Sequence, residues 1–192
     1  MVEIRMAHPA KNALSRDLMV WLESELDAAG SEPILLTGDS GAFSAGLNLA
    51  ELAGFDASDM ELFVRSLDAL VQRLWKHPAP TVACINGHAI AGGCVLALCC
   101  DYRIVADDPR LKLGLNEVAL GVCFPPVTFR VVERRVPREH HQRVLLGADL
   151  FGVEDALRMG IVDEVASDVE AAARARLAAM AKHPRDAYRR TK

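Results

Sequence analysis

The sequence predicts an α/β fold over residues 1–192, organised as a single domain. Segments with strand periodicity alternate with segments of helical periodicity, and no linker or low-complexity run separates them. The 192 residues, of which 51% are hydrophobic, can bury one continuous core. We therefore expect strands and helices to pack together without an internal domain boundary.

The first part of the chain predicts a strand, a helix and a second strand in turn. Apolar and charged residues alternate over residues 2–6, as in a strand with one buried face. Ser15 can cap a helix over about 16–29, and Gly30 can end it. Residues 33–37 form an apolar run that is typical of a buried strand.

A glycine- and serine-rich stretch at 38–46 is expected to be a loop, and a long helix follows it. Ser58 and Glu61 form a capping box for that helix. Apolar residues then recur at helical spacing until Pro78 and Pro80 stop the pattern. We interpret this stripe as core and not as a face for a lipid or a cofactor.

The second half of the chain continues the alternation. The expected elements are a strand at 81–85, a helix from the glycine pair at 92 to about 100, a strand at 102–106, helices at about 127–135, 139–146 and 153–159, a strand at 161–165 and a last helix at about 168–182.

The stretch Ala91–Asp101 is the first candidate functional motif. Two glycines follow the strand 81–85 and open an apolar segment, which predicts a buried helix that begins at the glycines. The first amides of a helix have no internal partner and carry partial positive charge, so they suit an anion. Glu117 follows in an apolar setting, where Leu115 and Val118 would raise its pKa by burying it. The alternative, that the glycines only pack a helix on a sheet, stays open.

The second candidate motif is the run 42–49, Ala-Phe-Ser-Ala-Gly-Leu-Asn-Leu. Small residues around Gly46 would let backbone amides face a ligand directly. Taken alone, the run equally fits an ordinary connection between two elements.

Several functional classes are not favoured by the sequence. The formal net charge of -4, the absence of a basic block and the low aromatic content do not favour nucleic acid as a partner. No cysteine pair has zinc-ligand spacing with matching histidines, so no metal site is expected. The five cysteines are Cys84, Cys94, Cys99, Cys100 and Cys123. Most of them lie in apolar runs, which is typical of free, buried thiols in a reducing compartment such as the cytoplasm.

Neither a signal peptide nor a membrane span is evident. The first six residues lack the apolar segment of a signal peptide, and no apolar run has membrane-spanning length. His8, His77 and His183 each precede a proline and are expected to be solvated, whereas His88 lies near the glycine turn and could line a site. Ser44 has no evident base, which does not favour a serine hydrolase.

Four motifs together resemble the crotonase (enoyl-CoA hydratase/isomerase) superfamily. They are Phe43-Ser44-Ala45-Gly46-Leu47, Ile85-Asn86-Gly87, Ala91-Gly92-Gly93-Cys94 and Gly114-Leu115-Asn116-Glu117. The similarity runs from Asn12 to about Val165, and the stretch from Gly93 to Gly121 is most similar to 3,2-trans-enoyl-CoA isomerases. The resemblance implies a spiral of strand-strand-helix repeats that assembles as trimers or dimers of trimers.

The resemblance also implies a substrate and a site. Family members bind acyl-CoA thioesters, with coenzyme A as part of the substrate and no separate cofactor, and hold the thioester oxygen between two backbone amides. Carried over by motif, these amides belong to Leu47 and Gly92, Glu117 is the acid/base, and Asn116 helps to position the substrate. The substrate-binding residues that this implies are Ala45, Gly46, Leu47, Asn48, Leu49, Gly92 and Asn116.

Two departures from the family pattern refine the expectation. Hydratases of the family carry a second glutamate where this sequence has Val95. A single carboxylate can move a proton between two carbons but cannot easily also activate water, so the sequence favours an isomerase. The chain also lacks the family's usual first strand and terminal helices, so we expect it to be truncated relative to the family. The alternatives are another crotonase reaction, such as hydration or decarboxylation, and an acyl-CoA binding protein without turnover.

Overall fold

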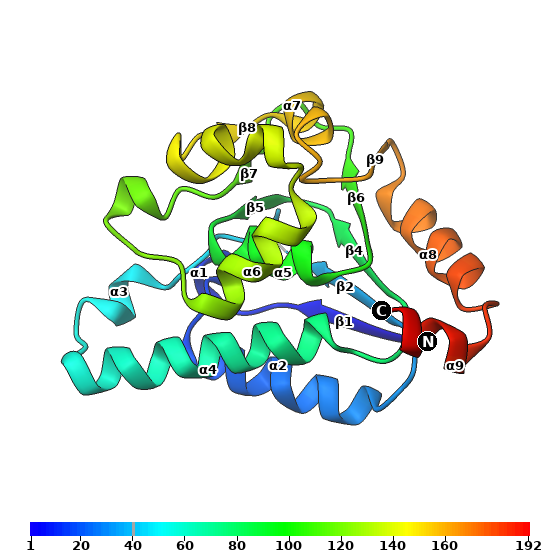
Figure 1. Ribbon diagram of the computed structural model, residues 1–192, viewed down its shortest axis with the longest axis horizontal. Helices are drawn as coiled ribbons and strands as arrows, with labels where there is room; N and C mark the ends of the chain where they lie inside the picture. The colour runs from blue at the N-terminus through cyan, green and yellow to red at the C-terminus, as the bar shows by residue number, and fades with distance from the viewer. Residues whose placement is uncertain (40) are drawn as a thin grey trace.

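The computed structural model describes residues 1–39 and 41–192, and its strands form two sheets (Figure 1). The larger sheet is parallel throughout, in the order β1-β2-β4-β6-β9, and consists of Val2–Met6, Ile34–Gly38, Thr81–Ile85, Tyr102–Ala106 and Glu164–Ala166. The smaller sheet has the order β3-β5-β7-β8 and consists of Ala42–Ser44, His88–Ile90, Leu113–Gly114 and Leu150–Phe151. Only the pairing of β7 with β8 is antiparallel among these strands.

The helices lie between and around the strands. The α-helices are α1 Pro9–Asn12, α2 Arg16–Ala29, α3 Leu49–Leu52, α4 Ala57–Trp75, α5 Gly92–Cys99, α6 Pro126–Arg135, α7 Val153–Arg158, α8 Val169–Met180 and α9 Arg185–Thr191. Short 3-10 turns cover Val118–Leu120 and Arg138–His140, and a π turn covers Gln142–Leu146.

Each repeat of the chain places one strand in each sheet and then a helix. The strands β2 and β3 precede α3 and α4, β4 and β5 precede α5, and β6 and β7 precede α6. This is the expected strand-strand-helix spiral, and it brings the ends of β3, β5 and β7 together at one edge of the smaller sheet. The two candidate glycine motifs and Glu117 follow these three ends.

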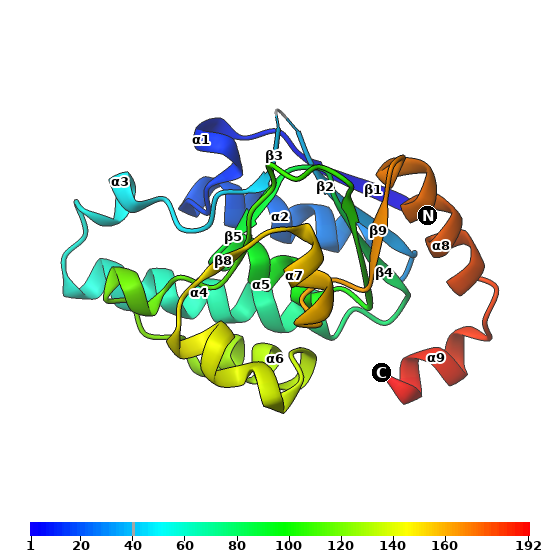
Figure 2. The same ribbon diagram turned by 90° about the horizontal axis from the view of Figure 1, so that it is seen from above.

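Apolar side chains cover both faces of the larger sheet. The main core cluster packs one face against α2, α4, α5 and α6, and a second cluster packs Leu35, Val82 and Ile104 against α8. Figures 1 and 2 show α8 on the opposite side of the sheet from α2 and α4. Because both faces are covered, β2 and β4 are buried along their entire length, which explains their continuous apolar runs.

Most of the predicted elements are confirmed, with boundaries shifted by a few residues. Helix α2 occupies the predicted range, with the Ser15 hydroxyl accepting a hydrogen bond from the Leu18 amide and Gly30 at φ +57°. The predicted strand at 161–165 lies at Glu164–Ala166, and the predicted helix at 139–146 is a 3-10 turn followed by a π turn.

Four expectations were wrong. The predicted loop at 38–46 contains the strand β3, because Ala42 and Ser44 pair with β5. Helix α4 is capped by Asp56, whose carboxylate accepts from the Asp59 amide, and not by Ser58. His77 is buried and its Nε2 donates to the carbonyl of Glu32 at 2.8 Å, so it is not solvated. The helix α9 was not expected.

Candidate active site

A cavity of about 80 Å³ lies between α4, α5 and the segments that follow β3 and β7. Its lining is almost entirely apolar and includes segments far apart in the sequence. The lining residues are Leu47, Leu52, Met60, Phe63, Val64, Leu67, Gly92, Val95, Glu117, Val122, Cys123, Phe124, Pro125 and Thr128. Leu47, Gly92 and Glu117, which the sequence singled out, therefore line one cavity.

The backbone after β3 turns sharply at Gly46 and presents Leu47 to the cavity. Gly46 has φ +89°, and a Cβ there would lie 2.7 Å from the carbonyl oxygen of Ile90, so only glycine fits without a shift. The chain then runs parallel to Leu14, whose amide donates to the Gly46 carbonyl at 2.6 Å and whose carbonyl accepts from Asn48 at 3.0 Å. These bonds use the residues on both sides of Leu47 and leave the Leu47 amide without a partner among the described residues.

The glycines at the start of α5 allow the helix to approach this loop. A Cβ on Gly92 would lie 2.7 Å from Leu14 Cδ1 and 3.4 Å from Leu47 Cδ2, and a Cβ on Gly93 would lie 2.5 Å from the Ser44 carbonyl oxygen. Gly92 is the first residue of the helix, so its amide has no acceptor within α5. The glycine pair can therefore serve both helix packing and anion binding. The close packing brings Gly92, whose amide has no acceptor within α5, next to Leu47.

Glu117 is the acidic side chain of the cavity. It is only 5% exposed, and within the described part of the chain its Oε2 has no hydrogen-bond partner. Burial raises the pKa of Glu117 from its ordinary value of 4.5 to about 7. A carboxylate with this pKa exists in both protonation states near neutral pH, as proton transfer in both directions requires.

No second carboxylate lines the cavity in the part of the chain that the structure describes. Val95 lies one turn into α5, is 1% exposed, and occupies the lining where a longer acidic side chain would reach the same space. Asp56 is used in capping α4, and Asp59 pairs with Arg16 at 2.6 Å on the surface. Neither of these carboxylates reaches the cavity.

The other predicted substrate-binding residues surround the cavity without lining it. The Ala45 amide donates to the Lys11 carbonyl at 3.0 Å, and the Gly46 amide donates to the Ser44 hydroxyl at 3.3 Å. Asn48 caps α3 by accepting from the Glu51 amide. These groups therefore hold the loop in place.

Leu49 and Asn116 also lie outside the lining. Leu49 begins α3 and is 49% exposed. Asn116 precedes Glu117 and has a buried Oδ1 that finds no partner among the described residues. Of the two, Asn116 has an unused polar atom beside the site.

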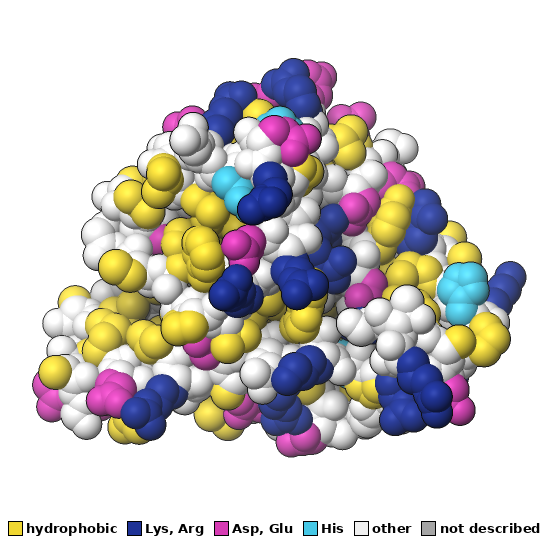
Figure 3. All heavy atoms as spheres, viewed as in Figure 1, with side chains coloured by type: hydrophobic (Ala, Val, Ile, Leu, Met, Phe, Trp, Pro, Cys, Tyr) yellow, Lys and Arg dark blue, Asp and Glu magenta, His cyan; other side chains and the backbone are white. Residues whose placement is uncertain are grey.

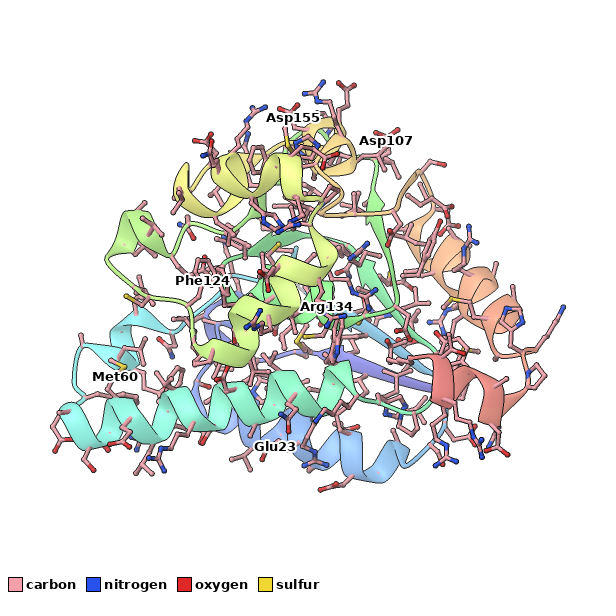
Figure 4. All side chains as sticks on the ribbon, in the orientation of Figure 1. Glu23, Met60, Asp107, Phe124, Arg134 and Asp155 are labelled. Atoms are coloured by element: carbon pink, nitrogen blue, oxygen red, sulfur yellow. The ribbon has the colours of Figure 1, made fainter. Side chains whose placement is uncertain are left out.

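The sequence did not predict the apolar residues that line the cavity, which are called its apolar wall below. Met60, Phe63, Val64 and Leu67 line the cavity from the first half of α4, so this part of the stripe is more than core. The periodicity carried no signal for it, because a buried helix face and a ligand-lining face have the same spacing. Phe124 and Pro125 also line the cavity, from the segment before α6. Figure 4 shows Met60 and Phe124 at the same end of the molecule.

The surface around the wall is apolar as well. Figure 3 shows hydrophobic side chains gathered over α3, the start of α4 and the segment before α6, whereas Lys and Arg side chains gather along α6. The exposed hydrophobic residues of this region are Leu49, Met60, Val118, Leu120 and Phe129.

The other candidate groups, apart from Cys123, lie outside the cavity. His88 Nδ1 accepts a hydrogen bond from the Lys112 amide at 3.0 Å and does not line the cavity. Among residues 1–39 and 41–192, no group of three or more His, Cys, Asp or Glu side chains is arranged to hold a metal ion. Within the same residues, no helix has both the length and the apolar character needed to cross a bilayer. Cys84, Cys94, Cys99 and Cys100 are buried and free, whereas Cys123 is exposed and free and is one of the residues that line the cavity.

Comparison with known proteins places these features in a family. The family model for enoyl-CoA hydratase/isomerase matches residues 1–192. The mitochondrial enoyl-CoA delta isomerase 1 of Mus musculus is 33% identical over 178 residues, covering 90% of this chain and 62% of the mouse protein. The human protein of the same name is 35% identical, covering 84% of this chain and 55% of its own length. The crotonyl-CoA hydratase of Syntrophomonas wolfei is 30% identical, covering 84% of this chain and 63% of that protein.

Solved structures agree on the fold. An enoyl-CoA hydratase/isomerase family protein from Pseudomonas syringae superposes with a TM-score of 0.92 at 28% identity, covering 98% of this chain and 83% of its own. The Mycobacterium tuberculosis enoyl-CoA isomerase superposes with a TM-score of 0.90 at 29% identity, covering 98% and 84%. The crotonase fold is thereby confirmed, although the chain spans only about three fifths of the mouse and human relatives. The chain belongs to the enoyl-CoA hydratase/isomerase family of the crotonase superfamily.

Proposed function

We propose that the protein is an acyl-CoA isomerase that moves a double bond from the β,γ to the α,β position of the acyl group. The observation that carries the proposal is the lining of the cavity, in which Glu117 is the one carboxylate among the described residues and α5 contributes Val95. The similarity to delta isomerases at 33–35% identity supports the same reaction.

The thioester oxygen accepts hydrogen bonds from the amides of Leu47 and Gly92. Both amides are free of other partners among the described residues, and Gly92 adds the positive end of the α5 dipole. One such donor is worth about 3 kcal/mol to a developing oxyanion, and an apolar surrounding strengthens it. The two amides therefore stabilise the enolate that forms when the α proton leaves.

Glu117 moves one proton between two carbons. As a carboxylate it takes the proton from C2, and the electron pair of that bond forms C1=C2 while the C1=O pair moves onto the oxygen. The resulting dienolate takes the proton back from Glu117 at C4, so that the double bond lies between C2 and C3. No atom is gained or lost, and the carboxylate is regenerated. Since the pKa of Glu117 is about 7, the transfer works in both directions near neutral pH.

Hydration is the alternative reaction, favoured by the crotonyl-CoA hydratase relative at 30% identity and by a putative enoyl-CoA hydratase of Thermus thermophilus at 34%. It requires one group to activate water and another to exchange the α proton. Among the described residues, the cavity presents one carboxylate for both tasks, which is why isomerisation fits the lining better.

We also propose a substrate class, an oligomeric state and a location for the protein. The substrate is an acyl-CoA thioester of fatty-acid oxidation, positioned with the help of Asn116, and no separate cofactor takes part, because the mechanism closes with Glu117 alone. Assembly as a trimer or a dimer of trimers, which the family resemblance supports, and a cytoplasmic location, which the free cysteines support, are part of the same proposal.

Turnover of a 3-enoyl-CoA tests the proposal. The conjugated 2-enoyl product absorbs where the substrate does not, so its appearance reports isomerisation directly. Binding of acyl-CoA without product formation, or exchange of the α proton without product formation, would contradict the isomerase assignment.

A further inference from the structure

One side chain joins two of the helices that contribute to the cavity lining, α4 and α6. Asp68 of α4 accepts hydrogen bonds from the Val127 amide at 3.2 Å and from the Thr128 amide at 3.1 Å. The Thr128 hydroxyl donates to the same carboxylate at 3.0 Å. These three hydrogen bonds are called the Asp68 clamp below.

The first amides of α6 have no hydrogen-bond acceptor in the side chain that precedes the helix. Helix α6 begins at Pro126 and is preceded by Pro125, whose side chain cannot accept a hydrogen bond. Pro126 has no amide hydrogen, so the amides of Val127 and Thr128 are the first that need an acceptor. A negative carboxylate also suits the positive end of the helix. The cap that most helices take from their own preceding residue therefore comes here from α4.

The clamp lies directly behind the cavity lining. Leu67, the residue before Asp68, lines the cavity from α4, and Thr128 lines it from α6. Both are nearly inaccessible to solvent, at 5% and 3%. The clamp thus ties α4 to α6 at a point where both contribute to the lining, in a cavity of only about 80 Å³.

We propose that Asp68 is a positioning residue that keeps the cavity narrow and so restricts the acyl group to unbranched chains. This inference rests on the proposed function, since it requires that the cavity holds the acyl part of an acyl-CoA. A straight chain fits between two walls held close together, whereas a methyl branch would need them to separate. Loss of the clamp frees the start of α6 from α4 and admits the branch.

The test compares the binding of two saturated acyl-CoAs with the same number of carbons, hexanoyl-CoA and 4-methylpentanoyl-CoA, by calorimetry. We expect the unaltered protein to prefer the straight chain by about tenfold, the size of effect that one misplaced methyl group has in a tight pocket. Asp68→Ala should reduce this preference to about twofold or less. Asp68→Asn keeps an acceptor oxygen and should restore most of it.

Two further variants separate positioning from loss of stability. Thr128→Val removes only the hydroxyl donor at nearly constant shape, and should lower the preference less than Asp68→Ala does. Asp168→Ala removes a comparable cap, since Asp168 accepts from the Ala171 amide at the start of α8, which is remote from the cavity. It should lower the stability by a similar amount and leave the preference unchanged.

The outcomes are distinguishable. If both acyl-CoAs bind but the preference is the same in Asp68→Ala as in the unaltered protein, or falls equally in Asp168→Ala, the role of Asp68 is refuted while the proposed function stands. If neither acyl-CoA binds to the unaltered protein, the proposed function fails and this inference fails with it.

Discussion

Glu117 owes its properties to the cavity more than to its neighbours in the sequence. The sequence predicted a raised pKa from burial by Leu115 and Val118. Leu115 is fully buried, but Val118 is 46% exposed, so only Leu115 can contribute fully to the burial. The residues that line the cavity with Glu117 come mostly from other segments of the chain, among them Phe63 of α4 and Val95 of α5. The direction of the pKa shift was therefore predicted correctly and its source only in part.

Replacing Glu117 with Gln tests its role as the acid/base. Glutamine has the same shape and can still be buried, but it cannot accept and return a proton. We expect isomerisation of 3-enoyl-CoA to fall by about 10²–10⁴-fold, while the affinity for a saturated acyl-CoA changes little. Steady-state kinetics and calorimetry on the same preparation measure both. Substantial turnover by the Gln variant would remove Glu117 from the mechanism.

The buried carboxyl group should also make stability depend on pH. Because burial raises the pKa of Glu117 from 4.5 to about 7, the folded state holds this proton more tightly than the unfolded state does. Its contribution to stability is fully present below pH 4.5 and is lost as the pH rises through about 7. Between pH 5 and pH 8 the free energy of unfolding should fall by about 2–3 kcal/mol more in the unaltered protein than in Glu117→Gln. Urea unfolding at the two pH values measures this, and equal slopes in the two proteins would contradict it.

At the scale of elements, the candidate site depends on how the start of α5 packs against the loop that follows β3. Helix α5 is buried along its whole length, and its first residue lies against the loop that carries Leu47. The sequence predicted this helix and its glycines, because an apolar run opened by two glycines after a strand has few other structures available. The contact with Leu47 depends on β3 and β5 being paired, which no local pattern of residues 38–46 indicated.

Gly92→Pro, compared with Gly92→Ala, tests the amide at this position. Both substitutions add a Cβ that must displace the end of the Leu14 side chain, but only proline removes the amide hydrogen. Proline is also compatible with the first position of a helix, so α5 should still form. We expect the proline variant to lose about 10²–10³-fold in kcat relative to the alanine variant.

Gly54, which does not line the cavity, provides the control substitution. Gly54→Ala adds a Cβ that meets nothing closer than 3.6 Å and should be close to the unaltered protein in activity. A folded Gly92→Pro variant with the kcat of Gly92→Ala would refute the oxyanion assignment.

At the scale of the whole molecule, the cavity joins segments that the sequence keeps far apart. Leu47, Phe63, Gly92, Glu117 and Phe124 come from five different segments and meet in one cavity. The alternation of strands and helices predicted the α/β class, and the glycine motifs predicted three of these residues through the family resemblance. The apolar wall and the Asp68 clamp could not be predicted, since they depend on which helices the spiral places side by side.

The same arrangement predicts which reaction the protein does not catalyse well. Within the described residues, no carboxylate other than Glu117 reaches the cavity, and Val95 offers no lone pair to orient water. We therefore expect the protein to isomerise 3-enoyl-CoA while hydrating 2-enoyl-CoA at least about 10²-fold more slowly, the contribution typical of one general acid or base.

Both reactions should be measured on one preparation, because the two signals are opposite. Hydration removes the absorbance of the conjugated 2-enoyl thioester, and isomerisation of the 3-enoyl thioester creates it. An apolar cavity with one carboxylate among the described residues suits the proposed isomerisation, since the dienolate never needs to meet water and the exclusion of water would strengthen the hydrogen bonds proposed from the Leu47 and Gly92 amides. Hydration as fast as isomerisation would require a second acid in the site. Asp56 and Asp59 would then be the first residues to replace, since they lie at the start of α4, one turn from the lining residues Met60 and Phe63.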